Sequence, residues 1–158
     1  MPEIETHNNI LTEEERIEMV NFIKTKLKKI SDNHPGLQTD PNLHEYPEMK
    51  IFLKKISSHT ENFKISHCWA NATNGDILGW HSHPHFIVRT LVYYLKNKSE
   101  IGTIFKKGES KDAESLQAIE VTKAPENSLA IFDGRLEHSG PIHLPEERIS
   151  VTVDLIES

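Results

Sequence analysis

The sequence predicts a mainly β protein, α+β by content, with one or two N-terminal helices packed on one face of a jelly roll. Three observations support this fold class. Apolar residues recur at helical spacing before residue 60, the chain after it consists of short segments rich in β-branched and aromatic residues, and turn-forming residues separate most of those segments. About eight strands in a row behind a helical segment are typical of a single β-sandwich or jelly roll.

We expect a single domain over residues 1–158, with a helical part over 1–60 and a β core over 61–158. The length suffices for one domain with a core, and the hydrophobic fraction of 36% predicts a rather small interior. The formal net charge of −6 provides no general basic field, so we expect no nucleic-acid partner.

Signals for membranes or secretion do not occur in the sequence. The first ten residues contain neither a basic segment nor an apolar run, and no stretch approaches the roughly 20 apolar residues of a membrane span. Cys68 is the only cysteine, so no intramolecular disulfide can form and a reducing compartment is the default. We therefore expect a cytoplasmic protein without a membrane partner.

Residues 11–30 form the clearest predicted helix. Thr12 as N-cap and Glu15 three residues later make a capping box, and the acidic start and lysine-rich end match the helix dipole. The polar residues 31–42 predict a loop, and a proline near the start of 46–58 predicts a shorter helix.

Eight later segments have the composition of strands, and turn formers separate most of them. They cover residues 63–72, 76–83, 86–96, 102–107, 116–123, 128–133, 136–142 and 148–157.

The second of these segments ends in two histidines one residue apart, His81 and His83. Alternate residues of a strand face the same way, so this pair can supply two metal ligands from one strand end. A third ligand must come from a distant segment, and His138 in a late strand is the best candidate. Neutral imidazoles suit iron, zinc, nickel and copper.

Other interpretations of the histidines stay open at this point. A His-x-His pair also arises by chance in a chain with ten histidines. An alternative pair, His83 with His85, is disfavoured because Pro84 between them disrupts regular strand pairing. Surface or loop positions are expected for His7, His34, His44, His59, His67 and His143.

The order of segments from Trp69 to Leu155 resembles the 2-oxoglutarate- and Fe(II)-dependent oxygenases, in particular their prolyl-4-hydroxylase-like branch. The matching segments are WANATNGDILGWHSHP, RTLVYYL, GTIF, VTKAPENSLAIFDGRLEHSGPI and RISVTVDL. In that family an Arg-x-Ser follows the distal histidine by about ten residues. Here Arg148 falls ten residues after His138, and Ser150 completes the pair.

The resemblance implies a double-stranded β-helix core and a role for each matching residue. His81 would be the first iron ligand and His138 the distal one. Arg148 would hold the distal carboxylate of 2-oxoglutarate, which its planar guanidinium fits, and Ser150 would add a hydroxyl. Tyr94 is expected at the same carboxylate, with a purely structural core tyrosine as an equal alternative.

The chain departs from the family at its first ligand motif. The usual motif is His-x-Asp or His-x-Glu, whereas this chain has His81-Ser82-His83. A subset of uncharacterised members, including phage and marine bacterial sequences, resembles this chain in pairing an HxHP motif with a Trp-x-Asn segment. Asp76 and Asp133 are the only nearby aspartates that could restore a carboxylate ligand, and neither has the right offset from His81.

The resemblance implies an oxidoreductase that uses Fe(II), 2-oxoglutarate and O2 to hydroxylate a small-molecule or peptidyl substrate. One alternative is a cupin-like three-histidine dioxygenase that does not use 2-oxoglutarate, against which the Arg148–Ser150 pair counts. The other is a non-enzymatic jelly-roll module that binds a metal. The polar loops give no indication of the substrate.

Overall fold

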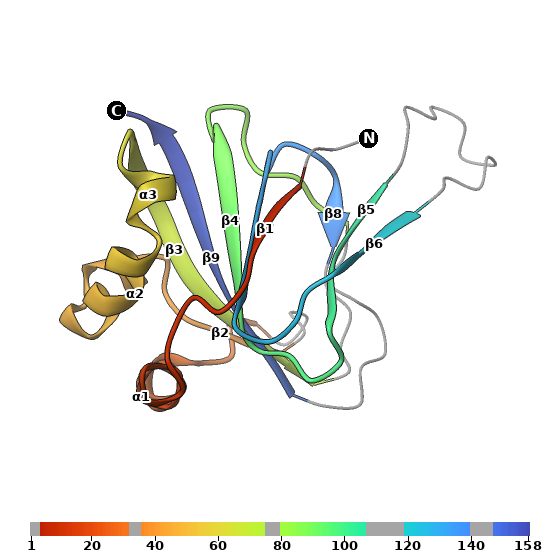
Figure 1. Cartoon of the computed structure of the whole chain (residues 1–158). Coiled ribbons are helices and arrows are strands. Elements are labelled where there is room, and N and C mark those ends of the chain that lie inside the picture. The colour runs from red at the N-terminus through yellow and green to blue at the C-terminus, as the bar shows by residue number, and fades with distance from the viewer. Residues whose placement is uncertain (1–3, 32–35, 75–79, 107–118, 140–146) are drawn as a thin grey trace.

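Antiparallel strands form two sheets in the computed structural model, which describes residues 4–31, 36–74, 80–106, 119–139 and 147–158. The larger sheet has the strand order β1-β7-β4-β9-β3-β2, and the smaller sheet has the order β6-β5-β8. Figure 1 shows the two sheets as separate layers, so the predicted jelly roll is confirmed. The strands are β1 Glu5–His7, β2 Leu37–Gln38, β3 Phe63–Asn74, β4 Arg89–Lys96, β5 Ile101–Lys106, β6 Ile119–Lys123, β7 Ser128–Phe132, β8 His138–Ser139 and β9 Glu147–Glu157.

Helices cover the outer face of the larger sheet, as predicted (Figure 1). The first helix has the expected capping box, in which Thr12 and Glu15 exchange two hydrogen bonds. It ends earlier than predicted because Lys28 pairs with Gln38 as an isolated bridge. The predicted helix over 46–58 is divided into shorter turns. The helical elements are α1 Glu13–Lys26, η1 Leu43–Glu45, η2 Pro47–Met49, α2 Lys50–Lys55 and α3 Ser57–Thr60.

The two faces of β9 have different chemistry. Its odd-numbered residues from Ile149 to Leu155 belong to the core beneath the helices. Its even-numbered residues from Arg148 to Asp154 lie on the opposite face by strand alternation, toward the smaller sheet, and these four are polar: Arg148, Ser150, Thr152 and Asp154. A second apolar cluster fills part of the space between the sheets, where Tyr94 and Phe105 pack together with four other residues. Polar residues are therefore buried on this inner face.

Several strand boundaries differ from the prediction. Strands β1 and β2 were not expected, and both are short and lie at the edges of the larger sheet. The predicted strand over 76–83 falls partly on residues 75–79, outside the described residues, and its remainder makes only a bridge at His81. The strand expected from residue 86 begins at Arg89, because the Ile87 amide first closes a turn onto Pro84. The predicted ends over 116–118 and 140–142 also lie outside the described residues.

No helix among the described residues is long and apolar enough to cross a membrane.

Candidate metal centre

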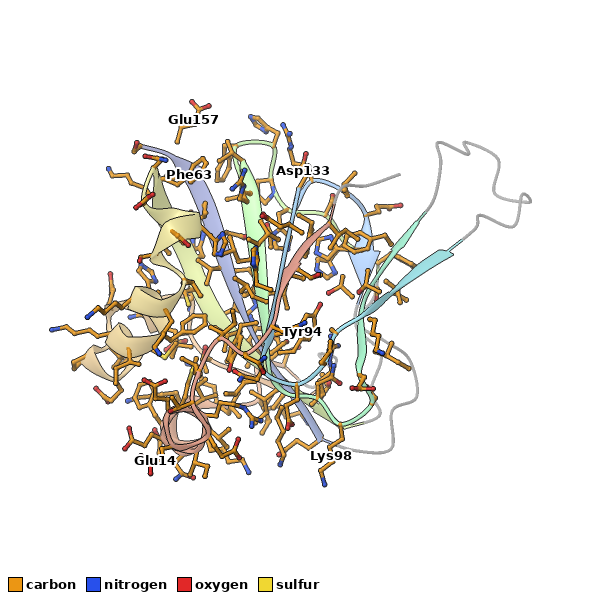
Figure 2. The ribbon with its side chains drawn as sticks, viewed as in Figure 1. Glu14, Phe63, Tyr94, Lys98, Asp133 and Glu157 are labelled. Atoms are coloured by element: carbon orange, nitrogen blue, oxygen red, sulfur yellow. The ribbon has the colours of Figure 1, made fainter. Side chains whose placement is uncertain are left out.

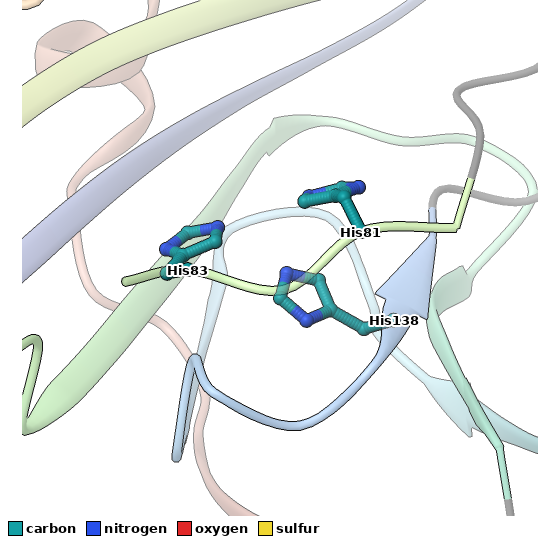
Figure 3. Close-up of side chains that lie close together, drawn as sticks. All are labelled: His81, His83 and His138. Atoms are coloured by element: carbon teal, nitrogen blue, oxygen red, sulfur yellow. The ribbon is translucent and has the colours of Figure 1, made fainter. Parts of the chain in front are cut away.

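Two segments far apart in the sequence meet at the inner face of the jelly roll. His81 and His138 pair as an antiparallel bridge, with backbone N–H to carbonyl distances of 3.0 and 2.9 Å. The His83 amide donates to the Gly134 carbonyl at 2.7 Å, which fixes the same segment at a second point. Backbone pairing alone therefore brings residues 81–83 next to β8 (Figure 3).

The structure gathers the three predicted histidines, His81, His83 and His138, into one cluster. Each offers one ring nitrogen, and these atoms all lie within 4.8 Å of one another. The ring centroids of His81 and His138 are 4.4 Å apart, and that of His83 lies 5.0 Å from His138. Figure 3 shows the three rings gathered at one place. Two imidazoles from residues 81–83 and one from β8 thus form a set of three potential metal ligands.

Hydrogen bonds set the ring orientation of two of these histidines. The Nδ1 atom of His138 lies 2.6 Å from the Leu136 carbonyl, and Nδ1 of His83 lies 2.7 Å from the Asp154 carboxylate. Both partners are acceptors, so each ring donates from Nδ1 and keeps its Nε2 lone pair free for a metal. This is the usual arrangement of metal-binding imidazoles.

His138 is held in its neutral form. Burial lowers the pKa of His138 to about 4, and the neighbouring His81 and His83 rings add to the shift. The side chain packs edge-on against Phe132, with ring centroids 5.1 Å apart. A neutral imidazole at ordinary pH is the form that binds a metal, so no proton has to leave this ring first.

Asp154 is the residue of this site that sequence analysis missed. It is buried on β9, and it accepts hydrogen bonds from both His83 and the Thr90 hydroxyl, each at 2.7 Å. The expectation that only Asp76 and Asp133 are near the first motif was wrong, because strand pairing brings Asp154 in from the end of the chain. The signal available in the sequence was that Asp154 shares the even-numbered, polar face of β9 with Arg148.

The two other aspartates have different surroundings. Asp76 lies outside the described residues. Asp133 is held by Arg135, whose Nε and Nη2 donate to its carboxylate at 2.9 and 2.7 Å. These hydrogen bonds lower the pKa of Asp133. The carboxylate is therefore engaged with an arginine rather than with a histidine.

Arg148 lies on the same inner face and is almost fully buried, with 7% of its surface exposed. Its guanidinium carbon is 5.1 Å from the centre of the Tyr94 ring, and its Nε is buried without a hydrogen-bond partner among the described residues. Burial lowers the pKa of Arg148, and Tyr94 opposes that shift. A buried cation with an unpaired donor fits an anionic ligand.

Tyr94 and Ser150 lie next to this arginine. They are direct partners across β4 and β9, and Ser150 is half-buried. The Tyr94 hydroxyl lies 2.7 Å from Oγ1 of Thr103 and accepts from the Thr103 amide at 3.0 Å. Figure 2 places Tyr94 between the sheets. Tyr94 is therefore a buried core residue with a hydrogen-bonded hydroxyl, and it also contacts Arg148.

The other histidines occupy varied positions. His7 and His59 lie on β1 and α3 and contact each other, whereas His67 and His85 are exposed. His44 is half-buried, and burial lowers its pKa. His34 and His143 lie outside the described residues.

Compared with family models and with curated proteins, the sequence gives no match. Solved structures do match in fold. The viral collagen prolyl hydroxylase from Paramecium bursaria Chlorella virus-1, in complex with 2-oxoglutarate, is 16% identical with a TM-score of 0.66 over 98% of this chain and 96% of that chain. A prolyl-4-hydroxylase from Pseudomonas putida is 12% identical, with a TM-score of 0.69 over 100% and 94% of the two chains.

A third match broadens the range of proteins with this fold. HygX from Streptomyces hygroscopicus, with nickel and 2-oxoglutarate bound, is 8% identical with a TM-score of 0.70 over 99% of this chain and 84% of that chain. At these identities the likeness concerns the fold. The chain thus has the jelly-roll fold of 2-oxoglutarate-dependent oxygenases, and its histidine cluster lies on the inner face of that fold.

Proposed function

We propose that the chain is a non-haem Fe(II)- and 2-oxoglutarate-dependent dioxygenase of the prolyl-4-hydroxylase-like branch, in its HxH form. It hydroxylates a small-molecule or peptidyl substrate. The observation that supports this most is the convergence of three imidazoles from two distant segments, with ligand atoms within 4.8 Å, on a sheet face that also buries Arg148.

The residues present suit a divalent iron. His81, His83 and His138 provide three neutral nitrogen ligands, and three protein ligands leave room for a chelating cosubstrate and O2. The hydrogen bonds that hold two of the rings by Nδ1 leave their Nε2 atoms to bind the ion. When bound, the iron with 2-oxoglutarate and O2 supplies the oxidation of a substrate C–H bond, while 2-oxoglutarate gives succinate and CO2.

Arg148 would hold the far carboxylate of 2-oxoglutarate. Its Nε is buried without a hydrogen-bond partner among the residues that the structure describes, and its planar fork matches a carboxylate. Ser150 lies on the same face of β9 and would add a hydroxyl donor, while the Tyr94 ring packs against the guanidinium. Burying a guanidinium without an anionic partner costs free energy. Binding of the dianionic cosubstrate would therefore also stabilise Arg148 in its buried position.

In the usual His-x-Asp or His-x-Glu motif, a carboxylate binds the metal directly. Asp154 would supply part of that negative charge through its hydrogen bond to His83. Among the residues that the structure describes, no carboxylate belongs to the ligand cluster, but Asp154 is hydrogen-bonded to His83 at 2.7 Å. A carboxylate partner makes an imidazole a more basic ligand and fixes its ring. We therefore propose that the negative charge near the metal comes from Asp154, the hydrogen-bond partner of His83, rather than from a metal ligand.

Succinate release tests the proposal. The protein is incubated with Fe(II), ascorbate and 2-oxoglutarate in air, without a substrate, since uncoupled turnover also yields succinate. Release is expected from the wild type and not from His138→Ala. Full release from an Arg148→Ala variant contradicts the proposed cosubstrate site.

The three-histidine set also favours a second candidate, a cupin-like dioxygenase that does not use 2-oxoglutarate. That enzyme would consume O2 with a small thiol and gain nothing from added 2-oxoglutarate. A non-enzymatic module would bind the metal and consume no O2. Oxygen uptake, measured with and without 2-oxoglutarate and with a thiol such as cysteine, separates the three functions.

A further inference from the structure

A second group of potential metal ligands lies on the other face of the larger sheet. Glu5, His7 and His59 each offer one ligand atom, and these three atoms lie within 4.8 Å of one another. Neither the histidine cluster nor the proposed dioxygenase activity involves these residues. Their arrangement therefore needs its own explanation.

Strand alternation brings two of these residues together. Glu5 and His7 are separated by one residue on β1, so their side chains project from the same face. Their partners on β7 are Ile131 and Leu129, which belong to the core beneath the helices. The pair thus faces the helical layer, away from the inner face where His81 and His138 lie.

The third residue comes from that helical layer. His59 lies on α3, and its ring centroid is 4.3 Å from that of His7. As in the first cluster, two of the potential ligands are separated by one residue and the third comes from a distant segment. The set consists of two nitrogens and one carboxylate oxygen, which suits Zn²⁺ and similar ions.

The His7 ring has an unsatisfied nitrogen. Its Nε2 lies 3.3 Å from Oε1 of Glu5, but it is buried and makes no hydrogen bond with any described residue. Buried polar atoms normally have a hydrogen-bond partner, and an ion bound between this nitrogen and Glu5 would satisfy it. An ion here would also join the Glu5 carboxylate, which remains half-exposed and open to solvent.

We propose that Glu5, His7 and His59 form a second divalent-metal site of the zinc class that joins β1 to α3. The short strand β1 lies at the edge of the sheet and, within the described part of the chain, is paired only with β7. A metal bridge to α3 would fix this edge strand to the helical layer. The site is structural and independent of the proposed dioxygenase chemistry.

The test uses a background in which the first cluster is disabled by His81→Ala and His138→Ala. Co²⁺ and Zn²⁺ are titrated into this variant by calorimetry, and Co²⁺ binding is followed by its visible spectrum. One ion per chain is expected to bind. Adding His7→Gln or His59→Gln should lower the affinity at least tenfold, whereas the matched control His67→Gln, at an exposed histidine of β3, should leave it unchanged.

Two results overturn the proposal: no stoichiometric binding in the background variant, or the same affinity after His7→Gln and His59→Gln. Far-UV circular dichroism in EDTA checks that each variant is folded. Amide hydrogen exchange gives a readout that needs no further substitution. In the background variant, Zn²⁺ should slow exchange in β1 at least tenfold, and unchanged exchange there also overturns the metal bridge.

Discussion

The Nδ1 atom of His83 lies 2.7 Å from Oδ1 of Asp154, although the two residues are 71 positions apart in the sequence. Both side chains are almost fully buried, and the Thr90 hydroxyl donates to the same carboxylate oxygen at 2.7 Å. The carboxylate is therefore fixed on two sides. His83, the second histidine of the His-x-His motif, is thus itself hydrogen-bonded to an acid.

Asp154→Asn should weaken metal binding without unfolding the protein. The amide keeps the size of the side chain and an acceptor for His83, but it removes the charge that makes the ring a more basic ligand. Loss of such a partner typically lowers metal affinity about 10- to 100-fold. Competition against a chelator of known affinity measures the change. Asp133→Asn is the matched control, because Asp133 pairs with Arg135 instead, and equal affinities for the two variants would refute this role of Asp154.

The fold was largely predictable because its signals are local. Capping residues, strand composition and turn formers indicated the first helix and the long strands, including β4 and β9. The structure brings His81 and His138 of the predicted cluster together through an isolated bridge, in which His81 lies outside the named strands and His138 begins β8. Strands β1 and β2 escaped prediction because two or three residues carry too little periodicity. Asp154 escaped because its partner depends on strand order, which one sequence does not specify.

His83→Asp recreates the usual His-x-Asp motif, and it should destabilise the metal-free protein. The new carboxylate cannot donate to Asp154, so two like charges face each other in a buried place. An uncompensated buried charge typically costs about 3–5 kcal/mol in the free energy of unfolding. Urea denaturation in EDTA measures this loss.

The double variant His83→Asp/Asp154→Asn should recover at least half of that loss, because it removes one of the two charges. Asp154→Asn alone provides the remaining corner of the double-mutant cycle. Strictly additive effects of the two substitutions would mean that residues 83 and 154 do not interact.

Gly134→Ala should disturb the ligand His83. A Cβ at Gly134 would overlap Oγ1 of Thr90 and would lie 3.2 Å from Nδ1 of His83. Both neighbours belong to the hydrogen-bond network around Asp154, so we expect a loss of metal affinity of about tenfold or more, as for other changes around ligands. Gly102→Ala is the contrast, because its Cβ would meet Tyr94, Thr122 and Ala124 instead. If Gly102→Ala weakens metal binding as much as Gly134→Ala does, the effect is not local to His83.

Arg148→Met should abolish tight binding of 2-oxoglutarate and leave metal binding intact. The substitution keeps an apolar stem of similar length against Tyr94 but removes the buried cation. A hydrogen bond to a charged group contributes about 1.5–3 kcal/mol, which corresponds to about a 10- to 100-fold loss in affinity. Anaerobic calorimetry of the Fe(II) protein with 2-oxoglutarate measures it. Arg148→Lys should bind 2-oxoglutarate with an affinity between those of the wild type and Arg148→Met, since an ammonium lacks the planar fork. Unchanged affinity in Arg148→Met would place the cosubstrate elsewhere.

The stability of the metal-free protein should fall between about pH 7 and pH 4 because of His138. Burial holds the pKa of this ring at about 4 in the folded protein, against an ordinary value of 6.5. As the pH falls through 6.5, the unfolded chain gains a proton at this position that the folded protein does not accept. Stability therefore decreases with falling pH until the folded ring also titrates, and the difference amounts to about 3 kcal/mol.

Urea denaturation in EDTA at pH 7.5 and pH 4.5 tests this for the wild type, His138→Gln and the control His67→Gln. Other groups titrate over the same range, so the informative quantity is the difference between the two pH values in each protein. His138→Gln has no ring to protonate and should lose less stability on acidification than the wild type, whereas His67→Gln, at an exposed histidine, should behave like the wild type. An equal loss in all three proteins would show that His138 is not kept neutral by the fold.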